Sequence, residues 1–581
     1  MSLEVVVPEV SDGVTAGTVI SIAVAVGDQV EEDQTLLELE TDKAVVAIPS
    51  PRAGTVKDIR VAEGDSAAVG SVIVVLDAAA QDRVDDKPGP DAVREQQTAV
   101  ESGEKAMETV AAPATKKPLP PAGAGLVVIG AGPGGYAAAF KAAELGLQVT
   151  LIDPEVNPGG VCLHRGCIPS KALLHVAKLV SEAEESAAIG VTFAPPKIDV
   201  AQVRDWKNAV VEKLTGGLGG KVQKLKLTYI RGTARFKNST TLQVKKVDGE
   251  ETELSFRQAI LATGSRPIML PGCEPGSQRI IDSTGALDLV DVPRSLLVVG
   301  GGYIGLELGS AYAAMGSKVS VVEMTEGLLP GCDRDLVSVL KRRLDKKFAE
   351  ILLKTKVVEL KEQKNAVAVV LEEKKGARVD RRFDKVLIAI GRKPNTENLG
   401  LENTAVQVNN KGFVVVDGQQ RTAEAHIFAI GDIAGEPMLA HKAYGEANVA
   451  AEVAAGRNAV FDPRAIPAVV FTDPEIAWCG LTETAAREQK IKITTAKMPW
   501  RGNGRTLTLG RDDGMTKLIV DPESDRLLGV AVAGPGAGEL IAEGVVALEM
   551  AAVSEDLRHS IHPHPTLSET LYEAAEMLFK P

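Results

Sequence analysis

Residues 1 to 79 alternate apolar and polar positions with a period of two, and short Gly-Asp turns interrupt the alternation. This pattern predicts short β-strands with one buried face. The pattern also repeats at an offset of 37 residues, so that Gly17-Thr18-Val19 matches Gly54-Thr55-Val56 and the run 36–40 matches 73–77. We therefore expect two similar halves of four strands each, packed into a small flattened β-barrel.

Large apolar side chains almost disappear between residues 80 and 123, where Ala, Pro, Asp, Glu, Gln and Lys predominate. A segment of this composition cannot bury enough apolar surface to fold, so we expect a flexible linker. As a random coil its ends would lie roughly 35–40 Å apart. The N-terminal barrel is therefore expected to be tethered but mobile.

Two later stretches each join a buried apolar strand to a glycine-rich turn and a helix of small residues. Three glycines and a carboxylate define each stretch: Gly130, Gly132, Gly135 and Asp153 in the first, and Gly300, Gly302, Gly305 and Glu323 in the second. Such glycines allow a tight turn and the close approach of a pyrophosphate to the helix N-terminus, and the carboxylate can accept from a ribose hydroxyl. The sequence therefore predicts two Rossmann-type domains, each of which binds a dinucleotide.

The pattern between and after these two stretches mixes helices with strands. Asp199–Lys226 has the spacing of an amphipathic helix, and Thr228–Leu261 has that of a β-meander with a turn at Asp248-Gly249. Alternating strands follow the second stretch, as far as an apolar strand and turn that contain Asp432. From about residue 462, strand patterns alternate with helices, which predicts an α+β domain at the C-terminus.

The composition narrows the class of protein. A chain of 581 residues has material for several domains. Its net charge of −13 and pI near 5.3 argue against nucleic acid or an anionic membrane as partner. The most apolar long stretch, Leu296–Gly316, contains Glu307 and belongs to the second Rossmann-type unit, so no integral membrane segment is expected. Five scattered cysteines and an N-terminus without a secretory signal indicate a reduced, cytoplasmic protein.

Two of the cysteines, Cys162 and Cys167, are separated by four residues and precede a helical pattern over Ser170–Leu179. At a helix entry a thiolate is stabilised by unpaired backbone N–H groups and the positive end of the helix dipole, which suits thiol exchange. A structural disulfide is the alternative, but closing so short a loop restricts the unfolded chain by only about 2 kcal/mol. We therefore favour a redox function for this pair. The other cysteines have no partner at such a spacing and are expected to be small buried or half-buried residues: Cys273, Cys332 and Cys479.

Between the two halves of the N-terminal domain, the run Glu40-Thr41-Asp42-Lys43-Ala44 falls at a tight surface turn, which would present Lys43 to solvent. This domain resembles a lipoyl domain, in which the modified lysine sits in an Asp-Lys-Ala turn at the junction of two such halves. A biotinyl domain would have methionine on both sides of the lysine. The resemblance implies a lipoyl group on Lys43. The alternative is an ordinary solvated lysine, but such a lysine would not need to lie at the junction of two repeated halves.

From residue 124 to the end, the chain resembles the flavoprotein disulfide reductases, and within them the dihydrolipoamide dehydrogenases. Independent motifs in a fixed order carry the resemblance: the two glycine motifs, the CxxxxC pair, Ala262-Thr263-Gly264, Gly431-Asp432 and the terminal run HPHPTLSE. It implies an FAD-binding domain in two parts (124–270 and 395–461), an NAD-binding domain (271–394) and an interface domain (462–581). The expected fold class is α/β, with two Rossmann-type dinucleotide-binding domains and an α+β C-terminal dimerisation domain, preceded by a small all-β lipoyl-type barrel (1–79) and the linker (80–123).

The resemblance also implies roles for the motif residues. The first glycine motif would hold the ADP half of FAD, and the site would be completed by Gly264, by Asp432 on the ribityl chain and by Lys171 beside the flavin. Pairing of Lys171 with Glu307 would explain a charged residue inside the apolar helix of the second motif. The second motif would hold the nicotinamide cofactor. We expect NAD rather than NADP, because Glu323 accepts from a free 2′-OH and would repel a 2′-phosphate.

For the chemistry, the resemblance makes Cys167 the thiol next to the flavin, where its thiolate can donate charge to the ring. Cys162 would be the interchange thiol that forms the mixed disulfide with substrate. His564 would act as the base, and Glu569 would orient it. The cysteines and the base lie far apart in the sequence, and the family solves this with a twofold homodimer in which each His564 completes the site of the partner.

The implied activity is oxidation of protein-bound dihydrolipoamide by NAD⁺ through FAD and the Cys162–Cys167 disulfide. The implied partners are the lipoylated acyltransferase subunits of a 2-oxo acid dehydrogenase complex. Glutathione reductase would need an arginine cluster in place of Glu323, and mercuric reductase a C-terminal cysteine pair. The alternative from another class is a lipoyl-bearing carrier or assembly protein whose flavoprotein body is not its main activity, and the intact cysteines, base and orienting carboxylate weigh against it. His164 and Arg165 replace the Asn-Val common in the family, and we interpret them as surface or tuning residues.

Overall fold

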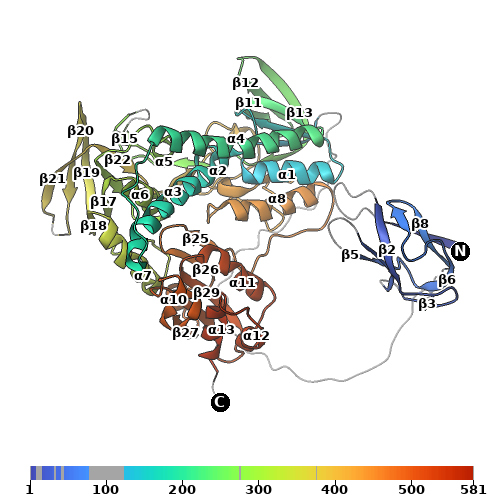
Figure 1. The fold of residues 1–581 in the computed structure, drawn as a ribbon. Coiled ribbons are helices and arrows are strands. Elements are labelled where there is room, and N and C mark those ends of the chain that lie inside the picture. The colour runs from blue at the N-terminus through green and yellow to red at the C-terminus, as the bar shows by residue number, and fades with distance from the viewer. Residues whose placement is uncertain are drawn as a thin grey trace, which may run out of the picture. The chain divides into compact units, whose positions relative to one another are not determined.

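A computed structural model describes residues 2–7, 16–31, 34–40, 45–77, 124–273, 277–374 and 376–579 (Figure 1). The chain divides into two compact units, Met1–Ala114 and Thr115–Pro581. The predicted linker (80–123) and Lys43 lie outside the described residues.

The described part of the first unit consists of two four-stranded antiparallel sheets, with strand orders β1-β8-β6-β3 and β5-β4-β2-β7. The strands are β1 (Ser2–Val6), β2 (Ala16–Ile22), β3 (Gln29–Val30), β4 (Thr35–Glu40), β5 (Val45–Pro49), β6 (Gly54–Ile59), β7 (Ser66–Ala68) and β8 (Val72–Asp77). Strands β4 and β8 are offset by the predicted 37 residues, and each sheet takes two strands from each half. Leu36, Leu39, Ile73 and Leu76 point into one shared core and are almost fully buried. The predicted barrel of two similar halves is thus confirmed.

A six-stranded sheet of order β12-β11-β10-β9-β13-β24 forms the centre of the first Rossmann-type domain within the described residues. Its strands are β9 (Ala124–Ile129), β10 (Val149–Asp153), β11 (Thr228–Asn238), β12 (Thr241–Lys246), β13 (Glu251–Leu261) and β24 (Ile427–Ala429). The helices are α1 (Pro133–Glu144), α2 (Gly160–Arg165), α3 (Cys167–Glu185), η1 (Ser186–Ile189), α4 (Val200–Lys224), η3 (Gly431–Ile433) and α8 (Ala440–Ala454). The predicted meander is present as β11-β12-β13, and β11 and β13 also continue into the parallel part of the sheet.

Helices α1 and α8 lie side by side along this domain (Figure 1). Their contact is made of alanines that are completely buried: Ala138, Ala139, Ala447, Ala450 and Ala451. Because each alanine adds only a methyl group, the two helix axes can approach closely. This packing holds the turn before α1 against the turn before α8, which are the two cofactor-binding turns predicted from the sequence.

The second Rossmann-type domain has a five-stranded parallel sheet of order β15-β22-β16-β17-β18, and a three-stranded antiparallel sheet β19-β20-β21. The strands are β15 (Ile280–Ile281), β16 (Ser295–Val299), β17 (Lys318–Glu323), β18 (Glu350–Leu353), β19 (Lys356–Gln363), β20 (Ala366–Glu372), β21 (Arg378–Phe383) and β22 (Lys385–Ile388). The helices are α5 (Ser283–Leu287), α6 (Tyr303–Ala314) and α7 (Arg334–Lys347). Strands β14 (Ser265–Pro267) and β23 (Arg392–Pro394) pair at the boundary with the first domain, and η2 (Leu401–Asn403) follows.

The C-terminal region is built on an antiparallel sheet of order β25-β26-β29-β28-β27. Its strands are β25 (Ala468–Val470), β26 (Glu475–Gly480), β27 (Thr494–Pro499), β28 (Met515–Val520) and β29 (Leu527–Gly534). The helices are α9 (Glu483–Gln489), η4 (Trp500–Gly502), α10 (Gly504–Thr508), α11 (Ala537–Glu549), α12 (Ser554–His559) and α13 (Glu569–Glu576). Trp500 lies at the centre of this core and is fully buried. The predicted fold class is confirmed: an all-β barrel comes first in the chain, followed by two Rossmann-type domains and an α+β C-terminal domain.

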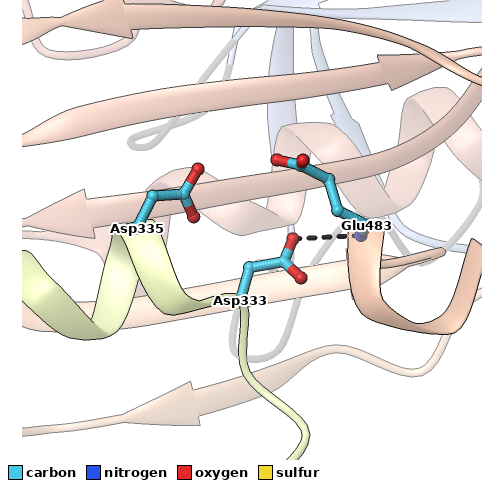
Figure 2. Close-up of side chains that lie close together, drawn as sticks. All are labelled: Asp333, Asp335 and Glu483. Atoms are coloured by element: carbon cyan, nitrogen blue, oxygen red, sulfur yellow. Dashed lines mark hydrogen bonds between the residues drawn. The ribbon is translucent and has the colours of Figure 1, made fainter. Parts of the chain in front are cut away.

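Three carboxylates gather where the second Rossmann-type domain meets the C-terminal sheet: Asp333, Asp335 and Glu483 (Figure 2). Asp333 and Asp335 flank the start of α7, and Glu483 begins α9. The fully buried ammonium group of Lys517, on β28, lies 2.7–2.9 Å from all three. A cation of the chain itself therefore occupies the centre of this cluster and joins the two domains.

Among the described helices, none combines the length and the apolar character needed to cross a membrane. The apolar stretch Leu296–Gly316 forms β16 and α6 instead, as the sequence predicted.

Candidate active site

The first glycine motif forms a tight turn between β9 and α1. Gly130 has φ +96°, and a Cβ atom there would lie 2.4 Å from the carbonyl oxygen of Ala262. A Cβ atom on Gly135 would lie 1.8 Å from the carbonyl oxygen of Gly130. Both positions therefore require glycine. Gly132 is the N-cap of α1, and the space in front of it is open except for Gly160, so the helix N-terminus is accessible to a ligand.

Asp153 closes this cradle at the end of β10. Its Oδ2 accepts from the backbone N–H of Ala131 at 2.7 Å, and its Oδ1 accepts from that of Glu155 at 3.0 Å. Burial raises the pKa of this carboxyl, against the opposing effects of the Ala131 hydrogen bond and the neighbouring His164 and Arg165. The carboxyl group is thus held in place beside the glycine turn.

The second glycine motif repeats this geometry between β16 and α6. A Cβ atom on Gly300 would lie 2.3 Å from the carbonyl oxygen of Ala389, and Gly302 has open space in front of it. Glu323 accepts from the backbone N–H groups of Gly301 and Thr325, at 2.7 Å each. A Cβ atom on the remaining motif glycine, Gly305, would lie 2.4 Å from the carbonyl oxygen of Gly300.

A cavity of about 430 Å³ runs from the first glycine turn to the two cysteines. It is lined by most of the residues that the sequence assigned to flavin and disulfide chemistry: Gly130, Gly132, Asp153, Cys162, Cys167, Lys171, Gly264, Glu307 and Asp432. The start of α6 reaches the same cavity through Tyr303. The open helix N-terminus, the buried carboxyl at the ribose position and the elongated cavity fit FAD.

The two cysteines lie on consecutive short elements, Cys162 within α2 and Cys167 as the first residue of α3. The structure holds them as free thiols, and Cys167 is exposed to the cavity. A hydrogen bond from the Cys162 thiol lowers the pKa of Cys167 to about 7, with further help from Lys171, while the same bond raises the pKa of Cys162. The pair is therefore arranged as a thiolate on Cys167 and a thiol on Cys162.

Lys171 and Glu307 form the expected ion pair across the cavity, with Nζ 2.8 Å from Oε2. Glu307 is almost fully buried, and its other oxygen accepts from the backbone N–H of Phe471 at 3.0 Å. The ring of Phe471 lies under the Lys171 ammonium, 4.3 Å from Nζ to the ring centroid. These contacts fix the ammonium group beside Cys167.

Asp432 lies in the turn before α8. Its Oδ2 accepts from the Ser265 hydroxyl at 2.5 Å, and Arg392 donates to that hydroxyl oxygen at 2.8 Å. Behind the turn, Glu446 accepts from the backbone N–H of Gly431 at 2.6 Å and is paired with Lys442 in a buried ion pair. Sequence reasoning missed this support, although an i, i+4 lysine and glutamate on an otherwise small-residue helix were a signal for it.

His564 and Glu569 lie together but away from the cavity. His564 Nδ1 is 2.8 Å from Glu569 Oε1, and the other oxygen of Glu569 accepts from the backbone N–H of Thr566. Neither residue is among those that line the cavity in the described chain, and the imidazole is 76 % exposed. The His564-Pro565 peptide bond is cis. The structure therefore brings the proposed base and its orienting carboxylate together, without bringing them to the cysteines of the same chain.

The remaining cysteines lie where the sequence predicted. Cys332 and Cys479 are buried, and Cys273 is half-buried against an apolar cluster. Arg165, expected to be a surface or tuning residue, is 40 % exposed, lines the cavity and is paired with Glu155. His164 points back to the carbonyl oxygen of Asn157, at 3.1 Å.

The chain matches three protein families. Residues 124–447 match the pyridine nucleotide-disulphide oxidoreductases, and residues 466–575 match the dimerisation domain of the same enzymes. Residues 3–76 match the domain family described as biotin-requiring enzyme.

Curated relatives and solved structures agree with these matches. Dihydrolipoyl dehydrogenases from Vibrio parahaemolyticus and Haemophilus influenzae are each 46 % identical over 452 residues, which is 78 % of this chain and 95 % and 94 % of those proteins. The structure of LpdA from Mycobacterium tuberculosis is similar with a TM-score of 0.73 at 28 % identity, over 78 % of this chain and 99 % of that one. The HOCl-induced flavoprotein disulfide reductase RclA from Escherichia coli has a TM-score of 0.69 at 28 % identity, over 78 % of this chain and all of that one. The chain therefore belongs to the pyridine nucleotide-disulphide oxidoreductase family and, within it, to the dihydrolipoyl dehydrogenases.

Proposed function

We propose that this chain oxidises protein-bound dihydrolipoamide to lipoamide with NAD⁺, as the E3 component of a 2-oxo acid dehydrogenase complex. The observation that carries the proposal is that Cys162 and Cys167 both line the cavity of the first glycine motif, together with the ion pair of Lys171 and Glu307. FAD bound there would supply the route by which an electron pair passes from the thiols to NAD⁺. Lys43 would carry the lipoyl group of the N-terminal domain, and lipoylated acyltransferase subunits would be the partners.

The thiol chemistry follows from the positions of the two cysteines. In the oxidised enzyme Cys162 and Cys167 form a disulfide, and a substrate thiolate attacks Sγ of Cys162. A bond forms between substrate and Cys162, the bond between the cysteines breaks, and its electron pair remains on Cys167 as a thiolate. The ammonium group of Lys171, held by Glu307, stabilises that thiolate.

The second step needs a base. His564 of the partner subunit takes the proton of the second substrate thiol at Nε2, since Nδ1 faces Glu569. The resulting thiolate attacks the substrate sulfur of the mixed disulfide, which closes the lipoyl disulfide and releases Cys162. Cys162 then receives the proton from the imidazolium. The exposure of His564 supports its placement in a shared site of a homodimer, as does the match of residues 466–575 to a dimerisation domain.

We place the enzyme in the cytoplasm, where thiols stay reduced. Only Cys162 and Cys167 have the spacing of a disulfide pair, so the sequence gives no sign of structural disulfides.

The direct test is NADH formation by the purified FAD-loaded protein with free dihydrolipoamide. Cys162→Ser should abolish turnover, because no mixed disulfide can form, while bound FAD is retained. The matched control is Cys273→Ser, which replaces a half-buried cysteine outside the cavity and should leave turnover unchanged. Turnover by Cys162→Ser would contradict the assignment of the interchange thiol.

The shared site has its own test. Heterodimers of a Cys162→Ser subunit and a His564→Ala subunit contain one site with both intact groups and one site with neither. We expect about half of the wild-type activity per dimer, by the twofold symmetry of the interface. Inactive heterodimers of confirmed composition would mean that each site is built within one chain.

A further inference from the structure

Arg165 occupies a position from which it can reach the cofactor cavity. It is the last residue of α2, whose first residue, Gly160, packs directly on the first glycine turn: a Cβ atom on Gly160 would lie 2.4 Å from Cα of Gly132. Five residues of helix rise separate Gly160 from Arg165, about 8 Å at 1.5 Å per residue. An extended arginine side chain spans most of such a distance, and Arg165 lines the cavity.

A single carboxylate holds the guanidinium in place. Arg165 Nη2 donates to Oε1 of Glu155, and within the described residues no other hydrogen bond engages this guanidinium. Glu155 is itself anchored, because its N–H donates to Asp153 and its carbonyl oxygen accepts from the Tyr229 hydroxyl at 3.1 Å. The remaining donors of the Arg165 fork are therefore available to a ligand.

The side chains that line the cavity carry more negative than positive charges, and Arg165 is the cation beside the first glycine turn. Four carboxylates and three cations line the cavity: Asp153, Glu155, Glu307 and Asp432 against Arg165, Lys171 and Arg392. Lys171 forms an ion pair with Glu307, and Arg392 donates to the hydroxyl and the carbonyl oxygen of Ser265. Beside the glycine turn, Asp153 and Glu155 face Arg165, and His164 is a second basic neighbour of Asp153. A pyrophosphate placed there would meet the dipole of α1 and this one guanidinium.

We propose that Arg165 is a cofactor-binding residue whose guanidinium donates to a phosphate oxygen in the ADP half of FAD. Glu155 orients the fork, and Asp153 accepts from the ribose next to it. The inference rests on the proposed binding of FAD in this cavity. A valine, which is common at this position in the family, could not make this contact because its side chain has no hydrogen-bond donor.

The affinity of the apoprotein for FAD tests the proposal, measured by titration with flavin fluorescence as the readout. Arg165→Gln should weaken FAD binding about tenfold, the loss of one charge-assisted hydrogen bond at a partly exposed site. Arg165→Lys should keep most of the affinity. The matched control is Arg235→Gln. Among the described residues, this exposed arginine of β11 hydrogen-bonds to the Gln243 side chain alone, and it lies outside the cavity. That variant should bind FAD as the wild type does.

Competition by fragments locates the contact. ADP and adenosine are each used to displace FAD, and only the displacement by ADP should weaken in Arg165→Gln. An equal loss for adenosine would place the guanidinium on the nucleoside and overturn the phosphate assignment.

A double-mutant cycle with Glu155→Gln separates direct contact from bracing. Glu155→Gln removes a competing carboxylate, so it should leave FAD binding unchanged or tighter, and Arg165→Gln should still cost about tenfold in that background. If Arg165→Gln has no effect once Glu155 is neutral, the arginine acts only by bracing the loop and the proposal fails. If wild-type apoprotein binds no FAD, the proposed function fails instead, so the two failures are distinguishable.

Discussion

Replacing Lys517 by methionine would test what joins the second Rossmann-type domain to the C-terminal sheet. Lys517 is fully buried, and its Nζ lies 2.9 Å from Asp333, 2.7 Å from Asp335 and 2.7 Å from Glu483. Figure 2 shows how the three carboxylates gather. Methionine has a similar unbranched apolar stem, so this substitution removes the ammonium group and leaves most of the packing. The expected loss is therefore mainly electrostatic.

The size of the loss follows from what remains around the carboxylates. Removing one partner of a buried ion pair costs about 3–5 kcal/mol, because the other charge stays buried. Asp335 and Glu483 are about one quarter exposed and keep Lys497, at 2.8 and 2.7 Å. Asp333 is 5 % exposed, and its remaining partners within the described part of the chain are hydrogen-bond donors at the start of α9. We therefore expect a loss of about 3 kcal/mol in the free energy of unfolding, the lower end of this range.

Urea unfolding followed by tryptophan fluorescence is the assay. Trp500 begins η4, is buried against the same sheet and donates to Thr516, the neighbour of Lys517 on β28, so its emission reports on this region. Lys497→Met is the matched control: it contacts two of the same carboxylates, but its side chain is 40 % exposed and its loss should cost less than 1 kcal/mol. Equal losses in the two variants would refute the argument from burial.

The pH dependence gives a second check on the same substitution. Burial acts to raise the pKa values of Asp333, Asp335 and Glu483, but hydrogen bonds from the lysines outweigh it, and all three pKa values lie below their ordinary range. A carboxyl with a lowered pKa contributes stability above its unfolded pKa, and this contribution is lost as the pH falls through the folded value. The wild type should lose stability below about pH 4. Without Lys517 less can be lost, so the difference between wild type and Lys517→Met should shrink on acidification. A difference that stays constant down to pH 3 would refute an electrostatic origin.

Three further predictions concern the proposed chemistry. His564→Gln should lower dihydrolipoamide turnover about 10²- to 10⁴-fold without loss of FAD, and Glu569→Gln should lower it less, because Glu569 orients the base rather than moving the proton; rates at equal flavin content test both. The wild type should use NAD⁺ in strong preference to NADP⁺, and Glu323→Ser should reduce that preference, as measured by kcat/KM with each cofactor. A chain truncated to residues 124–581 should bind FAD and oxidise free dihydrolipoamide at the wild-type rate, and loss of flavin on truncation would contradict an independent N-terminal domain.

Local periodicity predicted the elements whose neighbours are close in the sequence. The repeat over residues 1–77 determined the two half-barrels, because alternation alone sets which face of each strand is buried. Period-two patterning could not show that β11 and β13 serve both the meander and the parallel sheet, since the alternation is the same in both. Helix α3 begins at Cys167 rather than Ser170, because a helix start depends on the turn geometry before it.

Motif spacing predicted the site residues that a shared backbone geometry requires. It did not predict ion pairs between residues that are far apart in the sequence. The ion pair of Lys171 and Glu307 was predicted because a charge inside an apolar helix needs a partner. Lys517 gave no such signal, since its flanking residues are those of an ordinary strand and its carboxylates lie more than 30 residues away in the chain. Arg165 was equally hidden, because its partner Glu155 is ten residues away across a turn, outside the spacing of any regular element.

Both glycine motifs build the same cradle. The two turns have matching contacts, since Gly130 lies against Ala262 and Gly300 lies against Ala389. The two carboxyl groups also match, since Asp153 accepts from the N–H of Ala131 and Glu323 accepts from that of Gly301. The matched distances agree within 0.1 Å, at 2.4 and 2.3 Å for the glycines and 2.7 Å for both carboxyl contacts. The cradles themselves therefore cannot distinguish FAD from NAD.

The choice of cofactor must then come from side chains that lie beyond the repeated part. After Asp153 the chain enters α2, which brings the guanidinium of Arg165 to the cavity, where it is bonded to Glu155 and has further N–H donors. After Glu323, Arg334 donates to the carbonyl oxygens of Cys332, Leu328 and Leu329, and Lys354 is paired with Glu326. Each of these two cations therefore has partners within the chain, and Glu323 stays as the carboxylate of the second cradle. The carboxylate of Glu323 would repel a 2′-phosphate there. The residues that follow each carboxyl thus favour a flavin with its pyrophosphate in the first site and a nicotinamide cofactor with a free 2′-OH in the second. The glycines supply the backbone support that both sites share.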